Sequence, residues 1–441
     1  MTLTPLSIIL ITFISLILLV QIINQPLIGL IFVAASLPIT ELLPGIPFIS
    51  SVLPLLGGLS LLGYLLHSWK SRSRPLRGTR TILLIGLFFI TWVFLTHPNQ
   101  AWFGRDRNWI FTYGQLLILA FLVSELLVTP QQNRIFFWVF AVSAMVSSFV
   151  AIQQGYIGND ISTSVRTGGL SEGANSAGRY FVVGMIFLIY LYSVEKKTLL
   201  KFLAASGIVL TFIGVFYTVS RTSIILLVSA IGLSILLAPK RRLNIGLIIL
   251  FFGAIFLLTS LSESVVKLVS TIIPTISTQS DTFGLRIKLW QAAWKMWLDY
   301  PLAGVGIGMY RFNLYRYAVA IPSYYLSLVA HSTYFQLLSE TGIIGTLLWL
   351  TMPVLGISNL WKQSMRGDLE DQQVNRVWLI ALFVLLIGAI TMTQSAEKLI
   401  WLTFGVSQRA ALLAHKPHPK LVAEESTLQS RRAPGRVRTG I

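Results

Sequence analysis

The chain has 441 residues, with 34 lysines and arginines against 16 aspartates and glutamates, which gives a formal net charge of +18. Apolar residues make up 54% of it and charged residues only 11%, whereas a typical soluble domain is about 25% charged. This composition excludes a soluble globular enzyme, a disordered chain and a nucleic-acid-binding protein built of basic domains. It predicts an all-α, polytopic transmembrane helical bundle. The chain has no cysteine, which excludes disulfides and a thiol nucleophile and argues against structural zinc.

Thirteen apolar runs are long enough to form helices that span or enter a membrane. They lie near residues 5–23, 27–43, 51–67, 80–96, 109–128, 135–153, 178–194, 199–219, 222–238, 243–261, 332–360, 376–393 and 397–413. The first run has no basic start and no small-residue cleavage site, so we expect it to remain in the protein. If the first two runs form a hairpin, the chain has thirteen spans and an external N-terminus. If they form one span and a re-entrant piece, it has twelve spans and both termini are internal.

Basic residues set the orientation, because short cytoplasmic loops are enriched in lysine and arginine. Four basic loops alternate with less basic ones, at 70–80, 196–201, 240–242 and 362–376. We therefore expect these loops to be cytoplasmic and residues 1–414 to form the transmembrane domain. Residues 415–441 are basic and polar and are expected to form a disordered cytoplasmic tail. The stretch 262–331 is about 70 residues long and falls on the external side. Loops of that length are usually functional or disordered, and because this one is rich in tryptophan, tyrosine and glycine we expect it to be the catalytic loop.

Arg221 lies where two apolar helices meet with almost no loop between them. Ser220 or Thr222 can cap the second helix, whose free N–H groups together with a bidentate guanidinium would bind an anion. The alternative is an arginine that snorkels to anchor the helix end. We favour the anion site, since ionisable residues at such a depth are usually functional.

Residues 284–300 predict an interfacial amphipathic helix. At 100° per residue, one face carries apolar and tryptophan side chains, namely Leu289, Trp290, Ala293, Trp294 and Trp297. Arg286 is one turn before Trp290 and falls on this apolar face. It would either form a cation–π contact with Trp290 or point into a pocket towards an anionic ligand, and the spacing leaves both open.

A glycine-rich run, Gly304, Gly306 and Gly308, follows this helix. It lacks the preceding strand of a nucleotide-binding motif, so we expect a tight turn over the site. Beyond it, an aromatic and basic surface is predicted that would stack on sugars or hold phosphates; its members include Tyr310, Arg311, Arg316 and Tyr317.

His331 immediately precedes an apolar run and is the only histidine of the long external loop. It would serve as a general base, because imidazole accepts a proton near neutral pH, or it would be a hydrogen-bonded helix cap. Glu340 is expected to be structural, since it would lie on the opposite side of a continuous helix. Glu172, Asn175 and Arg179 would either contact substrate or belong to a solvated loop. No paired-carboxylate cluster faces outward, so no metal site is predicted.

At these positions the sequence resembles the O-antigen ligase and O-antigen polymerase superfamily of bacterial envelope proteins. The resemblance runs from about residue 50 to 405 and is strongest in Ser220-Arg221-Thr222, in Arg286-x-x-x-Trp290 and the following Asp299–Gly306, and in the motif from His331 to Gly345. Leu285 and Ser332 depart from the common pattern, which has glycine before the arginine and asparagine after the histidine.

The resemblance implies a metal-independent glycosyltransferase of the GT-C type, without a cofactor, in the bacterial inner membrane. It would move a glycan from a polyprenyl-diphosphate donor to an acceptor hydroxyl on the periplasmic side, where the acceptor is lipid A core or a growing glycan. It also implies that Arg221 and Arg286 bind the diphosphate and that His331 is the base. The alternatives are an anion or bicarbonate transporter of the same superfamily and a structural envelope protein. The spans are nearly uncharged and the basic candidates share one face, which favours the enzyme over a transporter.

Overall fold

The computed structural model describes residues 16–43, 52–71, 78–96, 108–157, 167–237, 282–317 and 328–414. Within these ranges every regular element is a helix. The helices are α2 (Pro26–Ser36), the 3-10 helix η1 (Leu37–Leu42), α3 (Val52–Ser71), α4 (Thr81–Thr96), α5 (Asn108–Leu126), α6 (Pro130–Ile157), α7 (Ala174–Val194), α8 (Thr198–Tyr217), α9 (Arg221–Leu237), α12 (Thr282–Asp299), α13 (Tyr310–Tyr317), α14 (Thr333–Ser364), α15 (Leu369–Gly388) and α16 (Lys398–Leu413).

Six helices of the described part are long and apolar enough to cross a membrane: α5, α6, α7, α8, α14 and α15. α4 and α9 are shorter apolar helices, and the pair Leu16–Asn24 and Pro26–Leu42 is bent by 117°. The all-α polytopic architecture predicted from composition is therefore confirmed. The count of twelve or thirteen spans stays a prediction, because the run 243–261 and much of the first run lie outside the described residues, as does the tail 415–441.

The core is formed around α7, which is buried from Ala177 to Leu191. Such a helix, apolar on all sides, must be surrounded by other elements. α6, α8, α9 and α15 pack around it. Phe187 of α7 stacks on Phe137 of α6 with ring centroids 4.3 Å apart, and both contact Trp378 of α15.

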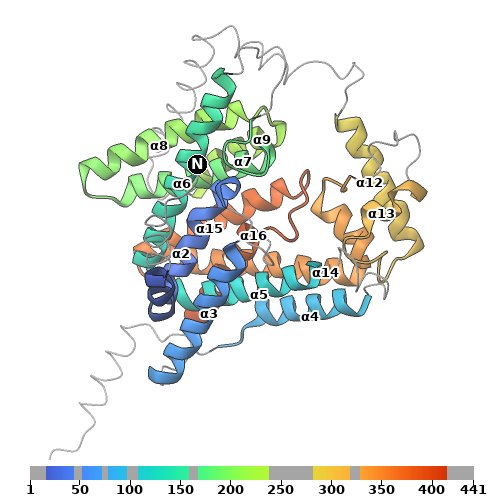
Figure 1. Ribbon diagram of the computed structural model, residues 1–441, viewed down its shortest axis with the longest axis horizontal. Helices are drawn as coiled ribbons and strands as arrows, with labels where there is room; N and C mark the ends of the chain where they lie inside the picture. Colours follow the sequence, from blue (N-terminus) through green and yellow to red (C-terminus); the bar gives the residue numbers. More distant parts are fainter. Residues whose placement is uncertain are drawn as a thin grey trace, which may run out of the picture.

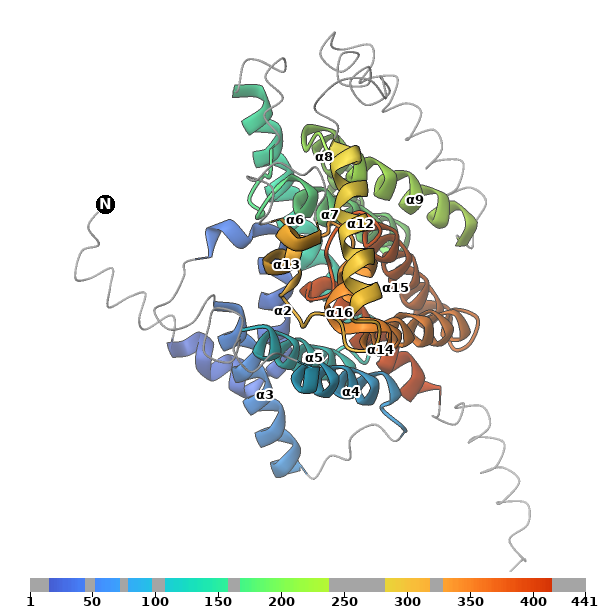
Figure 2. The same ribbon diagram turned by 90° about the vertical axis from the view of Figure 1, so that its right-hand side faces the viewer.

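The helices of the long loop lie at one end of the bundle. In Figure 1, α4, α5 and α14 run side by side, and α12 and α13 lie beside the end where α14 begins. Figure 2, seen from that side, shows α12 in front of the bundle. We refer to this end as the site end.

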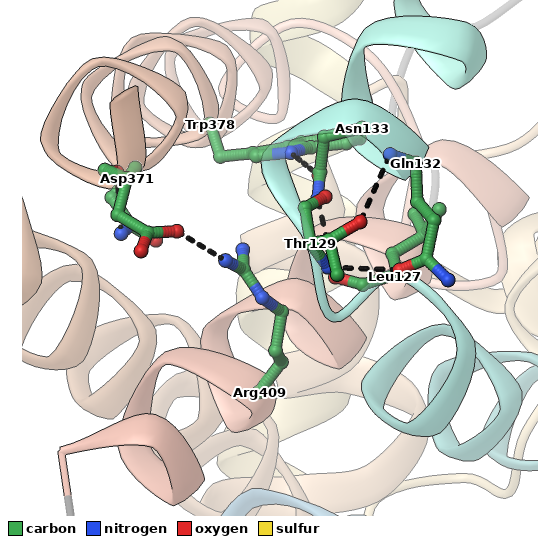
Figure 3. A network of polar contacts seen from close by, with 8 residues as sticks. Leu127, Thr129, Gln132, Asn133, Asp371, Trp378 and Arg409 are labelled. Carbon is green, nitrogen blue, oxygen red and sulfur yellow. Dashed lines mark hydrogen bonds and ion pairs between the residues drawn. The ribbon is translucent and has the colours of Figure 1, made fainter. Parts of the chain in front are cut away.

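At the ends of α15 and α16 away from the site end, polar contacts tie the helices together (Figure 3). The buried Arg409 of α16 pairs with Asp371 of α15 at 3.3 Å, and Trp378 donates a hydrogen bond to Asn133 of α6 at 2.9 Å. Thr129 accepts a hydrogen bond from the N–H of Gln132, which caps α6. These contacts offset the cost of burying charged and polar groups among apolar helices.

Candidate functional site

Arg221 is the first residue of α9, and only three residues separate it from Tyr217, where α8 ends. The Ser220 hydroxyl accepts a hydrogen bond from the N–H of Ser223 at 3.2 Å and donates one to Asn175 Oδ1 at 2.8 Å. The predicted cap is therefore confirmed for Ser220, which is buried, while the Arg221 side chain is exposed. This arrangement fixes the start of α9 and leaves the guanidinium accessible beside it.

Thr222 does not cap α9 but joins it to another segment. Its hydroxyl lies 3.0 Å from the hydroxyl of Thr391, which belongs to the connection between α15 and α16, residues 389–397. We call this segment the α15–α16 connection. None of its residues was singled out from the sequence.

The α15–α16 connection also holds the segment that carries His331. The N–H of Thr333 donates to the carbonyl oxygens of Ala389 and Met392, at 2.8 and 3.0 Å, and the Thr333 hydroxyl accepts from the N–H of Gln394 at 2.8 Å. His331 itself has a φ of 50°, a conformation that is uncommon for a residue other than glycine and often occurs at functional sites. α9 and the start of α14 are thus both fastened to one short segment.

α12, the helix that carries Arg286, is bonded to the segment of His331. The indole N–H of Trp290 donates to the carbonyl oxygen of Ala330, the neighbour of His331, at 3.0 Å. The Trp290 ring stacks on Phe335 of α14, with centroids 5.4 Å apart and planes 13° from parallel. Arg286 lies one turn before Trp290 and is partly buried. The structure therefore gathers the segments of Arg221, Arg286 and His331, which are far apart in the sequence.

The apolar face predicted for α12 needs a correction. The buried side chains are those of Leu289, Ala292, Ala293 and Met296, and they pack with buried residues of α13 and of the segment before α14, including Tyr310, Leu314 and Ala330. Trp294, expected to share this face, is 45% exposed. The buried face therefore runs through Ala292 and Met296 rather than Trp294, because α12 packs on protein along that side.

The glycine-rich run forms a turn that is bonded to α14. The N–H groups of Val305 and Gly306 donate to the carbonyl oxygens of Ser339 and Glu340 at 2.8 and 2.9 Å. α14 has non-helical backbone at Gly342, with φ 64° and ψ −170°, a region that only glycine adopts readily. A Cβ at Gly342 would meet the backbone of Leu302, so the kink lets the turn approach α14.

Tyr310 lies elsewhere than on the predicted aromatic surface. Its side chain is fully buried, its hydroxyl donates to the carbonyl oxygen of Leu289 at 2.8 Å, and burial raises the pKa of this phenol. Its N–H donates to the buried carboxyl of Glu340 at 3.1 Å. Both residues hold α12, α13 and α14 together, which agrees with the structural role expected of Glu340.

The other members of that surface have different surroundings. Arg316 is exposed and donates to the Tyr315 hydroxyl at 2.7 Å. Tyr317 donates to Asp299 at 2.8 Å, and burial, reinforced by this bond, raises the pKa of Tyr317 to about 12. Arg311 is exposed, stacks on Phe312 and lines a polar cavity. Tyr317 thus ties α13 to α12, Arg316 contacts a tyrosine of its own helix, and Arg311 lines the polar cavity.

The polar cavity has a volume of about 450 Å³ and opens beside the α15–α16 connection. Its lining is mostly polar or aromatic: Thr40, Trp109, Thr112, Glu172, Ser176, Tyr180, Arg311, Thr393, Ser395, Ala396, Glu397 and Lys398. Most of these residues were not identified from the sequence, because they come from segments that are far apart along the chain.

Arg179 is the largest departure from the predicted solvated loop. It is 2% exposed, within α7, and pairs with Glu397 at 3.1 Å. Its guanidinium also lies over the Tyr180 ring at 5.0 Å. Arg179 lies near the start of α7, at the site end. There its buried positive charge neutralises the carboxylate of Glu397, which lines the polar cavity. Among the described residues no cluster of three histidine, cysteine or acidic side chains could hold a metal ion.

A comparison with known families matches residues 206–350 to the family described as O-Antigen ligase. The matched segment contains Arg221, Arg286 and His331. A search of curated proteins found no match. The chain therefore contains a segment similar to the O-antigen ligase family within a polytopic membrane protein, and this supports its place in the O-antigen ligase and polymerase superfamily.

Proposed function

We propose that this protein is a metal-independent glycosyltransferase of the inner membrane that moves a glycan from a polyprenyl-diphosphate donor to an acceptor hydroxyl at the periplasmic face. The acceptor is lipid A core or a growing glycan. The observation that supports it most is the convergence of the three matched segments: Thr222 and Thr333 are both bonded to the α15–α16 connection, and Trp290 is bonded next to His331.

In this proposal, His331 removes the proton from the acceptor hydroxyl as its oxygen bonds to the anomeric carbon of the donor. The bond between that carbon and the diphosphate oxygen breaks, and the electron pair leaves with the diphosphate. Arg221 and Arg286 bind the leaving group through paired N–H bonds and stabilise its developing charge. A pair of arginines can supply this stabilisation without a metal ion.

An anion carrier of the same superfamily is less well supported. A carrier needs charges near the middle of the membrane that are reached alternately from both sides. The buried arginines of the described helices lie near helix ends, Arg179 close to the start of α7 and Arg409 close to the end of α16. Their partners Glu397 and Asp371 also lie near helix ends.

The test is transfer by the purified full-length protein, reconstituted in lipid, from a polyprenyl-diphosphate glycan to lipid A core or to a second donor molecule. We expect product in the presence of EDTA, at the rate seen without it. Absence of product with both acceptors would overturn the transferase, and a rate restored only by Mg²⁺ or Mn²⁺ would overturn metal independence.

A further inference from the structure

Two cavities adjoin at the site end, and they differ in character. The polar cavity described above meets a second cavity of about 350 Å³ between α2, α3 and α5. Its own walls are mainly apolar: Val33, Leu53, Pro54, Gly57, Gly58, Leu61, Gln115, Leu116, Ile118 and Leu119. Thr112, Ala396 and Lys398 line both cavities. An apolar and a polar compartment that share a wall match the two parts of an amphiphile.

The apolar cavity follows α5 from Thr112 to Leu119, which is about 10 Å along the helix axis. Gly57 and Gly58 of α3 contribute bare backbone to it. A Cβ built on either glycine meets no atom within 4 Å, so the space beside them is open. A hydrocarbon chain placed there would pack against apolar side chains.

Lys398 stands where the two cavities meet. It is the first residue of α16 and partly buried, and among the described residues it has no ion-pair partner. Glu397, the nearest acidic residue in sequence, pairs with Arg179 instead. A lysine at the border between an apolar and a polar compartment suits a phosphate that joins a hydrocarbon chain to a sugar.

The polar cavity has the groups that bind sugars. Trp109 and Tyr180 offer aromatic faces, and Glu172 and Ser176 offer hydrogen-bonding groups. Its wall also leads towards the proposed base. The Thr393 hydroxyl donates to Gln336 Oε1 at 3.0 Å, and the same oxygen accepts the N–H of Ala330, which precedes His331, at 3.2 Å.

We propose that these joined cavities bind the acceptor lipid, a phosphorylated glycolipid whose hydrocarbon lies in the apolar cavity, whose phosphate contacts Lys398 and whose sugar lies in the polar cavity. This inference rests on the proposed function, in which Arg221 and Arg286 hold the donor diphosphate. The cavity walls come from other segments, and of the lining residues only Arg311 falls within the matched stretch 206–350. The acceptor site is therefore built largely by the part of the chain outside the family match, where specificity for the acceptor can differ from one protein to another.

Gly57→Leu fills the apolar cavity and is the decisive variant. Leucine has a higher helix propensity than glycine, and the open space accepts its side chain, so the variant is expected to fold. Gly232→Leu on α9 is the matched control, because a Cβ there also meets no atom within 4 Å. Binding of labelled lipid A core to the purified full-length protein in nanodiscs is measured without donor, and binding of undecaprenyl diphosphate is measured separately.

We expect Gly57→Leu to weaken lipid A core binding at least tenfold and Gly232→Leu to leave it unchanged. Lys398→Gln should also weaken lipid A core binding. Lys398→Arg, which keeps the positive charge, should bind lipid A core about as well as the wild type. Unchanged binding in Gly57→Leu would overturn the proposal. Weaker binding of undecaprenyl diphosphate instead would assign the cavity to the donor tail and also overturn it. Because no transfer is measured, these outcomes are separate from a failure of the transferase assay.

Discussion

The backbone conformation of His331 bears directly on its proposed role as the general base. Its positive φ and the bonds of its neighbours Ala330 and Thr333 to Trp290 and to the α15–α16 connection fix its backbone. Such a backbone suits a side chain that must be held towards a reacting group. A helix cap would need no such tie to α12, which lies outside the bundle.

His331→Ala should reduce glycan transfer by about 10² to 10⁴-fold, the usual contribution of a general base, while donor lipid still binds. In the wild type the rate should fall at low pH as the imidazole takes up a proton and can no longer accept one. Initial rates measured across pH check this. If the residual activity of the variant keeps the same acid limb and donor binding is lost, the base lies elsewhere.

Arg221 and Arg286 differ in exposure, yet both are proposed to grip the diphosphate through two parallel N–H bonds. Lysine keeps the charge but not this geometry. Arg221→Lys and Arg286→Lys should therefore each lower transfer at least tenfold, as the loss of one strong charge-assisted hydrogen bond implies. Arg366→Lys, exposed beyond the far end of α14, is the control. Full activity of Arg286→Lys would instead support the cation–π role.

Among the elements, the α15–α16 connection organises the site end. It is bonded to α9 through Thr391, to α14 through Met392, Thr393 and Gln394, and to α7 through Glu397. A segment with this many partners cannot shift without moving both the Arg221 helix and the His331 segment. We infer that it holds the Arg221 helix, on the donor side of the site, in a fixed position relative to the His331 segment, on the acceptor side.

Glu397→Gln tests this anchor, because it leaves the buried Arg179 guanidinium without a counter-charge. Removing one partner of a buried pair costs about 3–5 kcal/mol, and since Glu397 is 31% exposed we expect about 3 kcal/mol. The thermal midpoint of the purified protein should drop accordingly. Glu370→Gln is the control. The Glu370 carboxylate oxygen lies 3.8 Å from the Arg134 guanidinium nitrogen, and the Glu370 side chain is 55% exposed, so losing this pair should cost little. Equal midpoints for both variants would mean that the Arg179 pair is not an anchor.

For the whole molecule, the orientation in the membrane decides whether the site faces the periplasm. The basic-loop pattern predicts that α12 is external and that the end of α14 is internal. The most direct positions for a label, residues 241 and 278, lie outside the described residues, whereas Trp294 and Met365 are described and are 45% and 54% exposed.

Because the chain has no cysteine, single cysteines at 294 and 365 can be labelled without background. In intact spheroplasts, an impermeant maleimide should label Trp294→Cys and spare Met365→Cys until the membrane is opened. Labelling of both from outside would contradict the topology and, with it, a periplasmic site.

The sequence by itself determined the helices and several local features of the site. Apolar runs of membrane-spanning length form helices wherever they are placed, because backbone groups in lipid must bond within the chain. The short turn before Arg221 and the Ser220 cap depend on neighbours in sequence, so they were predictable. Tertiary structure alone decided which face of α12 is buried, that Arg179 pairs with Glu397 inside the bundle, and that two cavities meet at Lys398. These features depend on contacts between distant segments, such as Thr222 with Thr391, 169 residues apart, and no local pattern of residues encodes such a pairing.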